Sequence, residues 1–196
     1  MKVKDIFSEI FIGVNLNNYK NIDDTQEVYT FKKENIIYNS ILYNDYGYNK
    51  FKKNPYKSLP NNKLLKINVS KRINEKYFIM FNDIIISIKK LYKVFNDIIT
   101  KREKFLVTNN YIILRGINSD MFYAPFVSYY IENIGIKKYL ESNNKISNEL
   151  TIEDIKNIEI PNITLKQQIK RYFSIHSRIM EILKYQDEIK TILNKK

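Results

Sequence analysis

The sequence predicts an α+β fold, in which an irregular mixed sheet with short helices is followed by a long C-terminal coiled-coil helix. Two short runs, 84–88 and 111–114, are rich in Ile and Leu and have the length and composition of strands. A third stretch, 164–194, contains neither Pro nor Gly and repeats apolar residues at spacings of three and four, which is typical of a heptad helix. Strands in the middle of the chain with few helices favour an α+β domain.

Two shorter helices are expected between the strands and the long helix. Pro125 fits a first helical position, the run 126–134 has helical composition, and Gly135 is typical of the residue past a helix end. The segment Thr151-Ile-Glu-Asp154 has the form of a capping box, in which each side chain bonds the backbone amide of the other residue. It predicts a short second helix.

The long helix opens with another capping box and carries two apolar stripes. Thr164-Leu-Lys-Gln167 forms the box. One stripe is a heptad seam, and the other, which contains His176, runs beside it. A single helix with two apolar stripes cannot bury both in water, so we expect a partner helix, with the domain covering at most its start. The residues predicted to form a dimer along the seam are Tyr172, Ile175, Ile179, Ile182, Ile189 and Leu193.

The charge balance favours a polyanionic partner. The chain has 33 Lys and Arg against 21 Asp and Glu, a formal net charge of +12, and such a surface attracts nucleic acid through its field and through counterion release. Cysteine is absent, which excludes disulfides and thiolate chemistry. Acidic residues interrupt the first segment, unlike a secretion signal, and no apolar run is long enough for a membrane span. We expect a cytoplasmic protein.

No catalytic centre is expected in this chain. Asn54-Pro-Tyr56 matches only part of an amino-methyltransferase signature, and no Gly-rich cofactor loop accompanies it. The carboxylates do not form a recognisable nuclease constellation. His176 is the only histidine, and on a helix stripe it is more often a polar seam position than a metal ligand or a base. We expect neither a metal nor a cofactor.

The order of several segments resembles the specificity subunits of type I restriction-modification systems. The segment 77–93, with Asp83-Ile-Ile-Ile-Ser87 at its centre, looks like the family segment that ends in Gly-Asp-Ile-x-x-Ser. The segment 109–115 looks like the strand that follows there. The segment 150–161, running into 165–169, is similar to the junction between recognition domain and conserved helix, and it is the most specific part. The opening Val3-Lys-Asp-Ile6 with Gly13 also fits.

Some positions depart from the family pattern. Asn82 stands where the family has Gly before Asp-Ile, and Lys89 or Lys90 stands where it has Gly after the first strand. The Gly ahead of the junction is replaced within Asn143-Asn-Lys145. Each of these substitutions can change a loop without changing the fold.

The resemblance implies a division of the chain and a set of partners. Residues 1–161 would be a target-recognition DNA-binding domain and 162–196 a conserved dimerisation and spacer helix. Family subunits usually hold two such domains and two helices, so this chain would be a half-subunit acting as a homodimer, or a fragment of a split subunit. Specificity subunits dock modification subunits, which methylate adenine with S-adenosylmethionine, and the complex also holds a restriction or motor subunit.

Loops rich in Lys, Asn and Tyr are the candidate DNA contacts, because Lys binds phosphates and amides read base edges. The segment 43–54 reads as a loop or irregular hairpin, and family subunits place the loop after the first strand beside the duplex. The candidates are Tyr46, Tyr48, Lys50, Lys52, Lys53, Asn54, Lys89, Lys90, Lys93, Asn143, Asn144 and Lys145. The alternative function is a basic coiled-coil protein-interaction module with nonspecific nucleic-acid binding, which salt-sensitive binding without sequence preference would favour.

Overall fold

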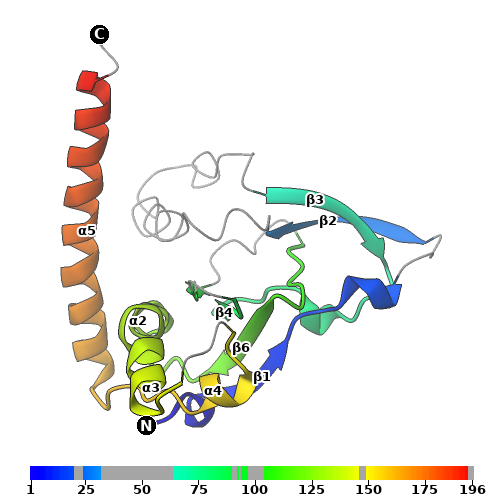
Figure 1. Ribbon diagram of the computed structural model, residues 1–196, viewed down its shortest axis with the longest axis horizontal. Helices are drawn as coiled ribbons and strands as arrows, with labels where there is room; N and C mark the ends of the chain where they lie inside the picture. Colours follow the sequence, from blue (N-terminus) through cyan, green and yellow to red (C-terminus); the bar gives the residue numbers. More distant parts are fainter. Residues whose placement is uncertain are drawn as a thin grey trace.

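A four-stranded sheet lies at the centre of the molecule (Figure 1). The computed structural model describes residues 1–19, 24–31, 64–89, 92, 94–96, 104–145 and 149–193. The sheet has the order β1-β6-β4-β5, with antiparallel neighbours, and the separate ribbon of β2 and β3 is also antiparallel. The strands are β1 (Phe7–Ile12), β2 (Thr25–Phe31), β3 (Leu64–Ser70), β4 (Ile84–Ser87), β5 (Val94–Asn96) and β6 (Tyr111–Ile117), with short 3₁₀ turns η1 (Val3–Asp5), η2 (Leu16–Tyr19) and η5 (Glu75–Tyr77).

Two parallel bridges accompany the antiparallel strand pairs, so the pairing is mixed. Tyr29 of β2 forms a parallel bridge with Phe105, and Val14 forms another with Thr108. The backbone N–H of Leu106 donates to the carbonyl of Tyr29 at 2.8 Å. The predicted α+β class with a mixed, irregular sheet is confirmed for the described residues.

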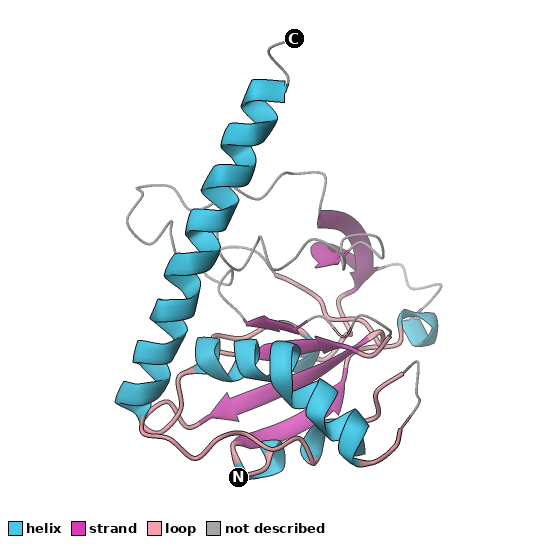
Figure 2. Cartoon of the chain, turned by 60° about the vertical axis from the view of Figure 1, so that its left-hand side comes forward, coloured by secondary structure: helices cyan, strands magenta, loops and turns pink. Residues whose placement is uncertain are grey.

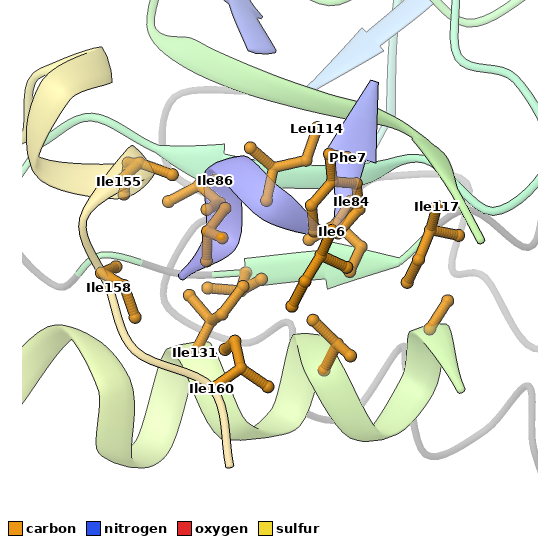
Figure 3. Packing of buried hydrophobic residues seen from close by; sticks show 14 of the residues in the cluster. Ile6, Phe7, Ile84, Ile86, Leu114, Ile117, Ile131, Ile155, Ile158 and Ile160 are labelled. Carbon is orange, nitrogen blue, oxygen red and sulfur yellow. The ribbon is translucent and has the colours of Figure 1, made fainter. Parts of the chain in front are cut away.

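Both faces of the two central strands, β4 and β6, are buried, which explains why their sequences read as continuous apolar runs. Ile84, Ile86 and Leu114 point into the larger core cluster, whereas Ile85 and Ile113 belong to a cluster on the opposite face. All five side chains are 0% exposed. Figure 3 shows the larger cluster, where the strand residues meet side chains of the helical layer and of the segment that leads out of it: Ile131, Ile155, Ile158 and Ile160.

The helical layer that covers this cluster is one continuous run with a wide turn in its middle. Helix α2 (Ala124–Tyr130) passes into a π turn, η6 (Ile131–Gly135), and then into α3 (Ile136–Ser142). The prediction that Gly135 ends the helix is therefore wrong. Its backbone is ordinary right-handed helix, with φ −62° and ψ −49°, but an added Cβ would lie 2.7 Å from Cγ2 of Ile158. Close packing requires this glycine.

Both predicted capping boxes are present. The Thr151 hydroxyl accepts from the backbone N–H of Asp154 at the start of α4 (Ile152–Lys156). The amide N–H of Gln167 donates to Oγ1 of Thr164 at 3.3 Å, and the N–H of Thr164 donates to Oε1 of Gln167 at 3.0 Å. This second box opens α5 (Leu165–Leu193).

Helix α5 is anchored at its base and extends away from the sheet (Figure 2). The buried amide of Gln168 accepts from the N–H of Tyr123 and donates to the carbonyls of Met121 and Ile163, each at 3.0 Å. The ring of Tyr172, 6% exposed, packs edge-on to Tyr123 with centroids 5.5 Å apart. No helix within the described ranges has the length and apolar character that crossing a bilayer requires.

Candidate nucleic-acid interface

The antiparallel pair β4–β6 has two ends of opposite character, and the first is closed by a buried ion pair. Nε and Nη2 of Arg115 donate to the two carboxylate oxygens of Asp83 at 3.0 and 2.6 Å. The guanidinium also donates to the carbonyls of Lys76 and Phe78 at 2.9 and 2.8 Å. Asp83 is 1% and Arg115 8% exposed. Burial raises the pKa of Asp83, while the hydrogen bonds from Arg115 and Met80 oppose that rise. We call this the paired end.

Left-handed backbone explains two positions at which Asn replaces the glycine of the resembled family. Asn82 has φ of 65°, and Asn144 has φ of 49°. Glycine adopts this conformation freely, and Asn is among the side chains that tolerate it best. Both substitutions therefore preserve a turn that the local chain path requires.

At the other end of β4–β6, backbone hydrogen bonds hold a tight turn. The N–H of Tyr111 donates to the carbonyl of Thr108 at 3.1 Å, which closes the turn. The N–H of Asn109 donates to Val14 at 2.9 Å, and the carbonyl of Asn110 accepts from Ile88 at 3.0 Å. Gly13 lies so close that an added Cβ would be 2.3 Å from the carbonyl oxygen of Thr108. We call this the open end.

The side chains on this turn are left exposed. Asn109 and Asn110 are both exposed, and within the described part of the chain neither amide side chain has a hydrogen-bond partner. Exposed Lys89 lies next to them, with a backbone bridge to Glu149. We call Lys89, Asn109 and Asn110 the amide ridge.

Two hollows flank the amide ridge, and all three of its residues line both. The first, about 370 Å³, lies between the turn and the β2–β3 ribbon and is lined also by Asn15, Asn17, Ser87 and Ile67. The second, about 600 Å³, lies toward α4 and includes Glu149, Glu153 and Lys156. The shape is a polar projection between two depressions.

The predicted DNA-binding residues fall into three groups. Lys89 lies on the amide ridge at the open end. Asn143, Asn144 and Lys145 follow α3, at a distance in sequence from that turn. The remaining candidates, Tyr46, Tyr48, Lys50, Lys52, Lys53, Asn54, Lys90 and Lys93, lie outside the described residues.

Lys145 has a partner within the chain. Its Nζ lies 2.6 Å from Oδ1 of Asp154, whose Oδ2 also accepts from the hydroxyl of Thr151 at 2.7 Å. Burial alone would raise the pKa of Asp154, but the hydrogen bonds from Lys145 and Thr151 outweigh it and lower that pKa. This ion pair holds the end of α3 to the start of α4, and DNA contact by Lys145 stays a prediction.

The predicted dimer seam begins on the chain's own domain. Tyr172 is buried against Tyr123, which leaves little of its ring for another helix. Ile175 is half-buried. The side chains of Ile179, Ile182, Ile189 and Leu193 lie outside those that the structure describes, so their part in a seam stays a prediction.

Sequence reasoning missed the residues that the structure gathers at the open end. Asn15, Asn17, Asn109 and Asn110 come from two separate segments that the turn brings together. A pair of adjacent Asn residues directly before a strand was the available signal. Among the described residues, no three His, Asp or Glu side chains are grouped so that they could hold a metal ion.

Comparison with known proteins shows the fold. No family model and no curated protein matches the chain. One similar solved structure is described as "Structural basis underlying complex assembly and conformational transition of the type I R-M system". The TM-score is 0.56 at 15% sequence identity, and the match covers 100% of this chain and 42% of that chain. This chain therefore shares its fold with part of the matched protein chain, and it spans less than half of that protein's length.

Proposed function

We propose that this chain is a sequence-specific DNA recognition subunit of a type I restriction-modification complex, reading one half-site per chain and docking modification subunits. The observation that carries the proposal is the fold match, which extends over the whole chain to a protein from a type I R-M structure. The net charge of +12 and the exposed amides of the amide ridge support it, since phosphates and base edges need those two kinds of group.

The proposed mechanism divides the work between the domain and the helix. Lysine side chains bind phosphates and position the domain, while amide side chains read bases. Two copies pair through α5 in a two-fold dimer, so each domain meets one half of a two-part palindrome. The helices set the distance between the half-sites.

No reaction is assigned to this chain. In the proposed complex, a modification subunit carries S-adenosylmethionine and methylates adenine, and a restriction or motor subunit cleaves. The present chain contributes the choice of site.

Selection from random duplex DNA tests the proposal. The purified chain, with its candidate modification subunit, is expected to enrich a two-part palindrome with a fixed spacer. If an intact complex enriches no sequence above bulk DNA, the specificity proposal fails, and a basic interaction module with nonspecific binding replaces it.

The dimer is tested separately. Replacing Ile179 and Ile182 with Asp should give a monomer by light scattering, because two carboxylates in an apolar seam remain unpaired. The domain should stay folded. The matched control puts Asp at Ser174 and Ser177, which are exposed on the same helix, and should leave the mass unchanged. A dimer that survives both substitutions at Ile179 and Ile182 would show that the seam is elsewhere.

A further inference from the structure

We infer that Asn109 and Asn110 of the amide ridge are the base-reading residues of this domain, and that the first hollow, with Lys89, receives the sugar–phosphate backbone of one DNA strand. This inference rests on the proposed function and adds to it the residues that read and the side from which the duplex approaches. It is carried by the rigidity of the turn, the free amides on it, and the different linings of the two hollows.

Rigidity is the first argument. Asn109 and Asn110 are central residues of a turn whose backbone bonds to Val14 on one side and to Ile88 on the other, at 2.9 and 3.0 Å. Gly13 packs closely against the turn, because a Cβ added there would lie 2.3 Å from the carbonyl oxygen of Thr108. The backbone of such a turn loses little freedom on binding, so the Cα atoms of the two Asn residues are already in place for recognition.

Unused hydrogen-bonding capacity is the second argument. An amide side chain offers two donors and an acceptor, and within the described residues the amides of Asn109 and Asn110 bond to nothing. Asn pairs bidentately with the N6 and N7 edge of adenine in the major groove. The turn directly precedes β6, and it presents both exposed amides at the open end, where a groove roughly 12 Å wide could receive them.

The linings of the hollows set the side on which the backbone lies. The described residues lining the first hollow include no Asp or Glu, and they combine Lys89 and the amides of Asn15 and Asn17 with apolar Leu65 and Ile67. Such a surface suits a phosphate on its polar side and a sugar on its apolar side.

The second hollow has a different charge balance. Two carboxylates, those of Glu149 and Glu153, line it together with Lys89 and Lys156. They offset its two cations, whereas no carboxylate offsets Lys89 in the first hollow, so the first hollow attracts a phosphate more strongly. The asymmetry therefore orients the duplex across the ridge, with the strand backbone toward the β2–β3 ribbon.

The test compares three substitutions in the full chain, assembled with the candidate modification subunit. Asn109→Ala and Asn110→Ala should each remove the preference for one base pair in each half-site. Each variant should bind the DNA sequence selected by the wild-type complex about 10-fold or more weakly. Its affinity for a DNA sequence altered at that base pair should change little. Lys89→Gln should weaken binding to all sequences alike and lower the slope of log affinity against log salt by about one per chain.

The matched control is Asn133→Ala. Asn133 is exposed on η6, in the helical layer that covers the larger core cluster, and the structure shows its amide donating to the carbonyl of Tyr129. The Asn133→Ala variant should enrich the same DNA sequence as the wild-type complex and bind it with wild-type affinity. Thermal unfolding monitored by circular dichroism checks that each variant is folded, and Asn110→Asp, which keeps the shape but removes the donors, should lose the same base preference.

The outcomes separate this inference from the proposed function. If the wild-type complex enriches a palindrome and the two Asn variants enrich the same one with equal affinity, the amide ridge does not read bases while the proposed function stands. If they weaken all sequences equally, the turn binds phosphates and the base-reading assignment is overturned. If the wild type enriches nothing, both fall together.

Discussion

The two ends of the β4–β6 pair use polar side chains in opposite ways. At the paired end, Asp83 and Arg115 are buried and hydrogen-bonded to each other. At the open end, Asn109 and Asn110 are exposed, and their side chains bond to no described residue. Buried polar groups must be satisfied for the chain to fold, whereas exposed and unsatisfied ones on a rigid backbone contribute little to folding. The comparison separates residues that maintain the fold from residues available to a partner.

The largest effect is expected at the paired end. Arg115→Ala leaves the Asp83 carboxylate buried without its partner and should lower the free energy of unfolding by about 3–5 kcal/mol. Urea denaturation measures it. Arg72→Ala is the matched control, because Arg72 is exposed and its loss should cost no more than about 0.5 kcal/mol. Equal losses in the two variants would contradict a special role for the pair.

The pair Lys145–Asp154, in which Asp154 is buried and Lys145 is half-buried, should have an intermediate effect. Lys145→Met keeps the aliphatic stem but removes the bond to the carboxylate, and should cost about 1–2 kcal/mol at neutral pH. Because the pKa of Asp154 is lowered on folding, this contribution is present above the unfolded value of 3.8 and is lost as the pH falls through the folded pKa. Denaturation at pH 7 and at about pH 3 should show the difference between variant and wild type shrinking; a constant difference would exclude the ion pair as its cause.

His176 combines the two properties that the ends keep apart, because it is buried and unpaired. Its side chain is 8% exposed, its ring stacks on Tyr172, and among the described residues Nδ1 has no partner. Burial lowers its pKa below 6.5, so the neutral form stabilises the fold above pH 6.5 and stability is lost as the pH falls from there toward the folded pKa.

His176→Phe keeps the stacking and removes the titration. Between pH 7.5 and pH 5.5 the wild type should lose stability, by about 1 kcal/mol or less, while the variant stays level. Since His176 is the only histidine, another histidine cannot produce the difference. Parallel pH profiles for the two proteins would mean that the imidazole is not buried in solution.

The smallest effect is expected at the open end. Asn109→Ala and Asn110→Ala should each change the free energy of unfolding by less than about 0.5 kcal/mol, because neither side chain bonds to the described chain. Denaturation midpoints give the value. A loss above 1 kcal/mol would mean that these amides maintain the fold, and the contrast between the two ends would disappear.

Local patterns predicted the elements well. The Ile- and Leu-rich runs 84–88 and 111–114 fall in β4 and β6, and both capping boxes formed with the expected partners. These features depend on residues within a few positions of one another. The prediction that Gly135 ends a helix was wrong because a glycine is needed there for another reason. The side chain of Ile158, which is distant in sequence, leaves no space for a Cβ at this position.

The candidate site was less predictable. The ion pair joins residues 32 positions apart and depends on strand register, which composition does not encode. Lys89 was predicted from its place after a strand and does lie at the open end. Asn109 and Asn110 were passed over because Asn is common along the whole chain, and only the fold shows that these two are rigidly held.

Residues 1–3 form a short antiparallel pairing with residues 158–160. The N–H of Val3 donates to Ile158 at 2.9 Å, and the N–H of Ile160 donates to Met1 at 2.8 Å. The polypeptide thus enters and leaves the β-rich region at one place, at the base of α5. Such an arrangement makes that region a cassette, because a β-rich region with different loops could be joined to the same helix through a single junction without altering the helix.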